Sequence, residues 1–181
     1  NGSAVYVSNE GDGTFCIIDA VSNLVTKTVP VGKNPHQLEV SNNGMHVFVA
    51  LNGEDAVAVV DAYTGDVLAK PAVGRAPHIA LLSQDGKRIF VTCEGDMKLA
   101  ILDAEQWKVI GEIPVFAMPR VPTLNRAGDR LYQTVRWLNG ALVIDLASGK
   151  VTDRVALGEP VFAQDGKDAH GIAFAPGASE L

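Results

Sequence analysis

The sequence predicts an all-β fold built from four-stranded repeats, and three observations carry this prediction. A short apolar run that ends in aspartate recurs every 42 residues, at Asp19, Asp61, Asp103 and Asp145. Three further runs accompany each one, all rich in the β-branched, aromatic and aliphatic residues typical of strands. Gly, Asn, Asp or Pro bounds the runs, and no segment shows a convincing helical pattern. Four antiparallel strands in about 40 to 45 residues is the spacing of a β-propeller blade.

The strands of each repeat can be assigned in order along the chain. The first strand is HQLEVS, HIALLS, RVPTLN or HGIAFA, and the second is AVYVS, HVFVA, RIFVT or RLYQT. The third ends in the repeated aspartate, and the fourth is LVTKTVPVG, DVLAKPAVG, KVIGEIPVF or KVTDRVALG. The turns NNG, QDG, AGD, TG and SG between these runs fit hairpins. The prediction is a single domain over 1–181 with sixteen strands in four units, approximately 3–44, 45–86, 87–129 and 130–181.

The two ends of the chain fall at different phases of the repeat. The chain starts in the second strand of one blade and ends after the first strand of another, at 170–175. That last strand could complete the N-terminal blade and close a four-bladed ring. Otherwise the chain is part of a larger ring, supplied by a longer precursor or by a homo-oligomer. An open arc would expose sheet faces and edges, which natural proteins avoid.

The amino-acid composition limits which kinds of partner the protein is expected to bind. The chain has 181 residues, 47% hydrophobic and 20% charged, which is the balance of a globular domain. A net charge of −6 and scattered Lys and Arg residues argue against a nucleic-acid partner. No apolar stretch approaches the roughly 18 residues that a membrane-spanning helix needs. The first residues carry neither an initiator Met nor a signal peptide, which suggests a processed or truncated chain.

Three stretches resemble the YVTN-type β-propeller repeat, whose pattern is PxG, an apolar strand, SPDGKxLYVTN, and VSVID followed by TG. They are VYVSNEGDGTFCIID, PHIALLSQDGKRIFVT and VFVALNGEDAVAVVDAYTG. The resemblance covers essentially the whole chain and is weakest at QTVRWLNGALVID. It implies a ring, usually of about seven blades, and a periplasmic, extracellular or surface-layer location. It does not imply one chemistry, because related propellers include lactonases and proteins that hold haem or copper.

Repetition also separates structural residues from candidate site residues. An aspartate that closes the third strand of every repeat is expected to stabilise the turn that follows it. His36, His78, Arg120 and His170 fall at the start of the innermost strand of successive blades, so they are expected to converge on one end of the central channel. Together they could bind an anion, a carboxylate ligand or, through the histidines, a metal. Alternatively, each imidazole holds a backbone carbonyl between blades. The fixed cation at Arg120 weakens the metal hypothesis.

Residues that depart from their counterparts lie mainly in the third and fourth repeats. Arg136 and Trp137 occupy a turn where the other repeats have a small polar pair, and an Arg beside an aromatic residue is common on binding surfaces. Met118 and an insertion at 159–168 also lack counterparts. Trp137 could instead cap a hydrophobic blade edge. His46 follows a turn and is expected at the surface, and Trp107 is expected to be structural.

The remaining chemistry is sparse. Cys16 and Cys93 are expected to be buried thiols, with a disulfide as the alternative, and no CxxC, HExxH, GxSxG, Walker or GxGxxG motif is present. The sequence therefore predicts a non-enzymatic ligand-binding or protein-binding scaffold, whose partner is a protein or a small anionic ligand at one ring face. The alternative is the propeller domain of an enzyme or redox protein, either a lactonase-like hydrolase or a haem- or copper-binding oxidoreductase. No particular cofactor is indicated.

Overall fold

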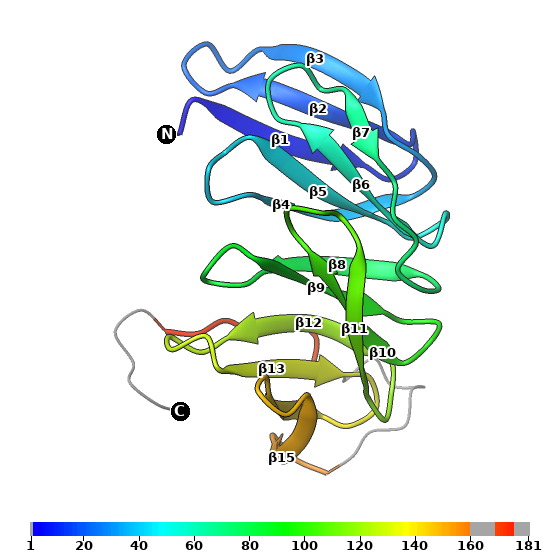
Figure 1. Ribbon diagram of the computed structural model, residues 1–181, viewed down its shortest axis with the longest axis vertical. Coiled ribbons are helices and arrows are strands. Elements are labelled where there is room, and N and C mark those ends of the chain that lie inside the picture. The colour runs from blue at the N-terminus through cyan, green and yellow to red at the C-terminus, as the bar shows by residue number, and fades with distance from the viewer. Residues whose placement is uncertain (1, 160–168, 176–181) are drawn as a thin grey trace.

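The computed structural model describes residues 2–159 and 169–175, which form four antiparallel β-sheets stacked along the long axis of the molecule (Figure 1). No helix occurs within these residues. The predicted all-β propeller architecture is confirmed, with fifteen strands in place of the predicted sixteen. The difference lies at 170–175, which is described but forms no strand.

The strands follow the chain in simple meanders. The first sheet contains β1 (Ala4–Asn9), β2 (Thr14–Asp19) and β3 (Val25–Pro30). The second sheet contains β4 (Pro35–Val40), β5 (His46–Leu51), β6 (Ala56–Asp61) and β7 (Val67–Ala69). The third sheet contains β8 (Pro77–Leu82), β9 (Arg88–Cys93), β10 (Lys98–Asp103) and β11 (Val109–Pro114). The fourth sheet contains β12 (Pro119–Leu124), β13 (Arg130–Val135), β14 (Gly140–Asp145) and β15 (Lys150–Ala156).

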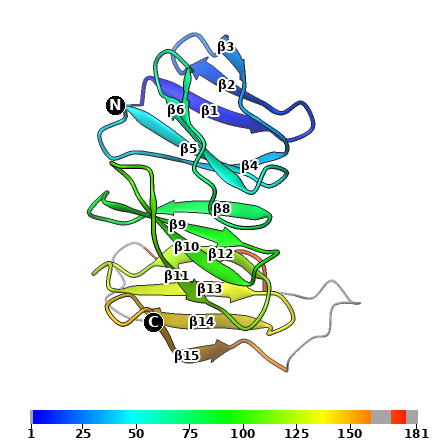
Figure 2. The same cartoon turned by 45° about the vertical axis from the view of Figure 1, so that its right-hand side comes forward.

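The first strands of successive sheets lie beside one another. β8 contacts both β4 and β12 (Figures 1 and 2), whereas β1, which contacts β4, is the second strand of its repeat. These first strands are therefore the innermost strands of the blades, as the repeat pattern predicted. Among the described residues the four sheets form an open stack, with the first sheet at one end. Residues 169–175 lie at the other end, against the fourth sheet, where the rings of Phe174 and Tyr132 are 6.0 Å apart. The described residues therefore form a partial propeller.

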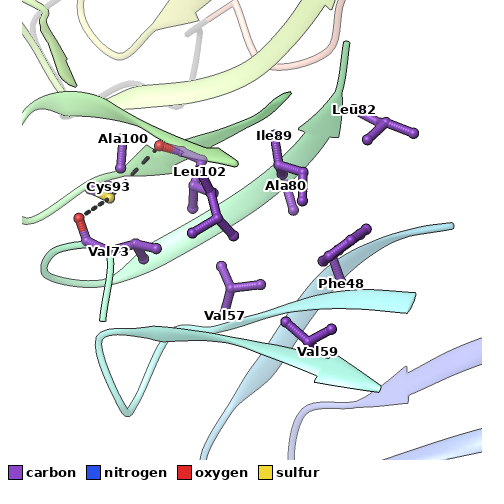
Figure 3. Close-up of a cluster of buried hydrophobic side chains, with 11 residues drawn as sticks. Phe48, Val57, Val59, Val73, Ala80, Leu82, Ile89, Cys93, Ala100 and Leu102 are labelled. Atoms are coloured by element: carbon purple, nitrogen blue, oxygen red, sulfur yellow. Dashed lines mark hydrogen bonds between the residues drawn. The ribbon is translucent and has the colours of Figure 1, made fainter. Parts of the chain in front are cut away.

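Side chains of one strand pack alternately against the two neighbouring sheets. Val47 and Val49 on β5 belong to the core shared with the first sheet, whereas Phe48 between them belongs to the core shared with the third. Figure 3 shows Phe48 with Val57, Val59, Ala80 and Leu82 in the core between the second and third sheets. Successive residues of a strand point to opposite faces, so a strand with both faces covered is apolar throughout. This explains why HVFVAL carries no polar alternation.

The four repeated aspartates close their turns as predicted. In every repeat the carboxylate accepts a backbone hydrogen bond of 2.7 Å from the residue three positions further along the chain. These pairs are Asp19 with Ser22, Asp61 with Thr64, Asp103 with Gln106 and Asp145 with Ser148. Hydrogen bonding holds the pKa of all four carboxyl groups below the ordinary value of 3.8; backbone bonds contribute most at the first three, and the Ser148 hydroxyl contributes most at Asp145.

The aspartate turns predict how stability depends on pH. Because the folded pKa values lie below those of the unfolded chain, their stabilisation is fully present above pH 3.8 and is lost as the pH falls through the folded values. Urea unfolding between about pH 5 and pH 2.5 should therefore show a free energy of unfolding that declines steadily below about pH 4. A constant value across that range would contradict the turn-closing role.

Candidate functional site

Three of the four predicted channel residues lie at the same end of the innermost strands. His36, His78 and Arg120 each follow the proline that begins an innermost strand, β4, β8 and β12. The imidazole rings of His36 and His78 lie 3.9 Å apart between centroids, tilted by 33°. Since adjacent blades place equivalent residues side by side, the 42-residue spacing becomes direct contact between two rings.

Glu94 joins this group and fixes Arg120. The Nη1 atom of Arg120 lies 2.7 Å from Oε1 of Glu94, and Nε2 of His78 lies 3.7 Å from the same oxygen. The three side chains are only 8% (His78), 14% (Glu94) and 19% (Arg120) exposed. A charge-assisted contact with this little solvent holds the guanidinium in a defined place. Glu94 directly follows β9, whose last residue Cys93 pairs with Pro77, so it lies beside the start of β8.

His170 occupies the position equivalent to His36. The hydroxyl of Thr134 on β13 donates a 3.0 Å hydrogen bond to the backbone oxygen of His170. The hydroxyl of Ser8 on β1 makes the same contact with the backbone oxygen of His36. Ser8 and Thr134 are equivalent residues of their repeats, so this shared hydrogen bond gives His36 and His170 the same place relative to the preceding sheet. His170 is exposed. We call His36, His78, Glu94, Arg120 and His170 the inner-strand cluster.

The inner-strand cluster keeps His78 neutral. Burial and, to a smaller extent, the positive charges of His36, Arg120 and His170 together lower the pKa of His78 from 6.5 to about 4. At neutral pH the ring therefore carries one N–H donor and one acceptor nitrogen. Its Nδ1 atom is buried and has no hydrogen-bond partner within the described part of the chain. A buried polar atom without a partner is costly, and a bound ligand could satisfy it.

Arg136 and Trp137 lie outside the inner-strand cluster. They form part of the turn between β13 and β14, as predicted. The backbone N–H of Arg136 donates to the carbonyl of Met118 at 2.9 Å. Both Arg136 and Trp137 line a cavity formed by the fourth sheet and the connection between β11 and β12. The six predicted site residues therefore divide into two places: the inner-strand cluster, and this cavity.

His46 differs from its expectation as a surface residue. It begins β5 and is half-buried, with its ring 5.4 Å from that of Trp107 in an edge-on arrangement. Trp107 in turn packs against the core shared by the second and third sheets, which agrees with a structural role. His46 therefore serves the packing of the sheets and is the one histidine outside the inner-strand cluster.

The two cysteines, both among the described residues, are not joined in a disulfide. Cys93 is buried, and burial raises its pKa to about 11, so its thiol is protonated at neutral pH. The expectation of burial was wrong for Cys16, which is half-exposed because β2 lies in the first sheet at the end of the stack. Within residues 2–159 and 169–175, no three His, Cys, Asp or Glu side chains are grouped to hold a metal ion.

Glu94 is the member of the inner-strand cluster that sequence reasoning missed. In the sequence Glu94 lies in one of the small polar turns between the second and third strands, and its counterparts there are Glu10 and Asn52. A signal was available: Arg120 is the only non-histidine among the four equivalent positions, and a buried guanidinium needs a carboxylate partner. The turn after β9 was the place to look for it, since it adjoins the start of the innermost strand.

The architecture and the inner-strand positions define this chain as part of a β-propeller, and comparison with solved structures agrees. A chain of hydrazine synthase from Kuenenia stuttgartiensis is similar with 26% identity and a TM-score of 0.80, over 84% of this chain and 46% of that one. The dihydro-heme d1 dehydrogenase NirN, in complex with DHE, is similar with 17% identity and a TM-score of 0.60, over 86% and 44%. The Cps50 (Swd1) β-propeller domain of Myceliophteria thermophila is similar with 16% identity and a TM-score of 0.73, over 88% and 54%.

The chain spans about half the length of these similar structures. No protein-family model and no curated protein matches the sequence. The similar propellers include enzymes, one of them in complex with DHE, and a protein described only as a propeller domain. In the described ranges 2–159 and 169–175, the structure contains no helix with the length and apolarity needed to cross a membrane.

Proposed function

We propose that this chain is part of a YVTN-type β-propeller from an exported protein, located in the periplasm or outside the cell, and that it is a binding module. The repeat motifs of the sequence support the family assignment, and the propeller architecture agrees with it. The binding role rests on the inner-strand cluster, because loops and strand ends on a rigid scaffold are where propellers carry recognition residues.

The ligand that best fits the inner-strand cluster is a small carboxylate-bearing anion. The observation that carries this proposal is the position of Arg120: Glu94 holds one of its nitrogen atoms, Nη1, at 2.7 Å. A guanidinium has five N–H donors, so the remaining ones can serve a second carboxylate. The neutral His78 ring offers a further buried polar atom, Nδ1. Beside burial, the imidazoles of His36 and His170 and the guanidinium of Arg120 provide a positive potential that lowers the pKa of His78 and that an anion would relieve.

Isothermal titration calorimetry with malonate at pH 7 tests this proposal. Wild-type protein should bind malonate saturably, and Arg120→Ala should weaken binding at least about tenfold, because hydrogen bonds to a charged group contribute about 1.5 to 3 kcal/mol. Arg75→Ala is the matched control: it also breaks an arginine–carboxylate pair, Arg75 Nε to Asp96 Oδ1 at 2.6 Å, but an exposed one outside the inner-strand cluster. Equal malonate affinity in the wild type and Arg120→Ala would refute the proposal.

The second candidate is the propeller domain of an enzyme or a cofactor-binding redox protein. Two observations favour it: the 26% identity to a chain of hydrazine synthase, and the neutral His78 ring, which is the protonation state that ligates metals. Elemental analysis and an absorption spectrum of purified protein would reveal a copurifying metal or haem. If one is found, His36→Ala combined with His78→Ala should abolish its uptake; full retention in that double variant would remove these histidines as ligands.

A further inference from the structure

The cavity formed by the fourth sheet and the connection between β11 and β12 is a second candidate site, separate from the inner-strand cluster. Its volume is about 470 Å³, within the range of small-molecule pockets. Most of its walls are apolar. The apolar side chains come from the connection after β11, from the end of β13, from the turn that follows it, and from β14 and β15: Phe116, Val135, Trp137, Leu138, Leu142 and Val151.

The equivalent positions of the second and third sheets make a polar contact instead. In the second sheet Oε1 of Glu54 accepts a 2.9 Å hydrogen bond from the backbone N–H of Lys33. In the third, Oδ2 of Asp96 accepts one of 2.8 Å from the backbone N–H of Arg75, whose side chain also pairs with Asp96. Gly32 precedes Lys33, and Gly74 precedes Arg75. At Gly74 an added Cβ would lie 2.8 Å from Oδ2 of Asp96. The polar contact therefore requires a glycine.

The fourth sheet replaces all three members of this contact together. Phe116 stands in place of the glycine, Ala117 in place of Lys33 and Arg75, and Leu138 in place of the acid. Without the carboxylate and the long cationic side chain, the lining at these positions becomes apolar. Phe116 is 82% exposed at the rim. An exposed aromatic ring beside an apolar cavity is typical of a ligand-binding surface and has no use in packing the blade.

The turn that carries Trp137 also has a backbone conformation that differs from its counterparts. Trp137 has a φ angle of +71°, in the left-handed region that bulky residues rarely adopt. Its counterparts Gly53 and Gly95 do not have positive φ angles, although glycine could adopt them freely. Backbone strain at a bulky residue persists only where the surroundings hold it, and it is concentrated at functional sites. The backbone of this turn therefore differs from that of its counterparts, and the residue that it carries lines the cavity.

The charged groups at the cavity favour an anion. Arg136 and Arg154 line it, with Asp153 as the only acid among the described lining residues. Nη2 of Arg154 donates to the carbonyl of Leu138 at 3.2 Å, which places this guanidinium at the cavity wall, and Oδ1 of Asp153 accepts from the backbone N–H of Arg154 at 2.7 Å. Among the described residues that line the cavity, two guanidinium groups therefore stand against one carboxylate.

We propose that this cavity binds a small aromatic carboxylate, with its ring against Phe116, Trp137 and Leu138 and its carboxylate toward Arg154 and Arg136. Aromatic rings supply large contact areas with preferred stacking geometries, and guanidinium groups recognise carboxylates through paired hydrogen bonds. This proposal does not depend on the function assigned to the inner-strand cluster, because none of the residues that line the cavity belongs to that cluster.

Calorimetric titration with 2-naphthoate tests the proposal. Wild-type protein should bind it saturably at submillimolar concentration. Phe116→Gly, which restores the residue of the second and third sheets, should weaken binding at least tenfold, and Leu138→Asp should weaken it further by placing a carboxylate in the cavity. Tyr63→Ala is the matched control, because it removes an exposed aromatic ring on the second sheet, and it should leave the affinity within twofold of wild type.

Two further titrations locate the site and its chemistry. Arg120→Ala should bind 2-naphthoate as wild type does; a loss there would assign binding to the inner-strand cluster and overturn the proposal. The neutral analogue 2-naphthalenemethanol should bind at least fivefold more weakly than 2-naphthoate, and equal affinity would overturn the carboxylate preference. No binding by wild type up to several millimolar, or unchanged binding in Phe116→Gly, would also overturn the proposal.

Discussion

Replacing Phe48 with alanine is expected to lower the free energy of unfolding by about 3 to 5 kcal/mol, which is the range for truncating a fully buried aromatic ring. Phe48 is 0% exposed and lies where the second sheet packs on the third, between Val59 of its own sheet and Leu82 of the next (Figure 3). Its loss leaves a cavity that two rigid sheets cannot close. Urea denaturation, analysed with a constant slope, gives the value directly.

Two variants make this prediction specific. Phe48→Leu keeps most of the volume and should cost about 1 to 1.5 kcal/mol. Tyr63→Ala removes a ring that is 70% exposed and should change the free energy of unfolding by no more than about 0.5 kcal/mol. If Phe48→Ala were as mild as Tyr63→Ala, the face-to-face packing of the second and third sheets would not hold in solution.

Replacing Arg120 with alanine is expected to raise the pKa of His78 from about 4 by about one pH unit or more. The substitution removes a positive charge that opposes protonation, and it leaves the Glu94 carboxylate, 3.7 Å from Nε2 of His78, without its cationic partner. Burial remains the largest cause of the low pKa, so the value should stay below 6.5. NMR titration of the histidine ring signals measures it.

The same change alters the pH dependence of stability. Because the folded pKa of His78 lies below 6.5, its stabilising contribution is complete above pH 6.5 and is lost as the pH falls toward 4. Arg120→Ala should reduce that loss. Arg75→Ala, which breaks an exposed pair, should leave the pKa of His78 where it is in wild type. An unchanged His78 pKa in Arg120→Ala would show that Arg120 does not act on His78, and it would contradict the inner-strand cluster as described.

The architecture could be predicted from the sequence because every level of the repeat agrees. The aspartates at 42-residue intervals mark the ends of the third strands, and the NNG, QDG and AGD turns mark the first hairpins, where Gly44, Gly86 and Gly128 have φ angles near +71°. The placement of His36 beside His78 followed from the same period. A repeat fixes which residues are equivalent, and stacking then makes equivalent residues neighbours.

What the sequence did not reveal depends on contacts between different positions of the repeat. Glu94 pairs with Arg120 of the next sheet, and no periodic comparison connects residues at different phases. The apolar lining of the cavity at Phe116 depends on Phe116 and Ala117 together with Leu138, which lies on a different turn, and a comparison of single positions does not connect them. Cys16 is partly exposed because its strand lies in the sheet at the end of the stack. The sequence of that strand resembles a buried strand, so it did not reveal this exposure.

The central claim is that the inner-strand cluster is a ligand site, and one NMR experiment tests it most directly. Malonate is titrated into wild-type protein at pH 7 while the ring signals of the histidines are followed. The account predicts saturable shifts at His36 and His78, whose rings lie 3.9 Å apart, and no shift at His46, which packs against Trp107 elsewhere. Equal shifts at all the histidines, or none at His36 and His78, would contradict it.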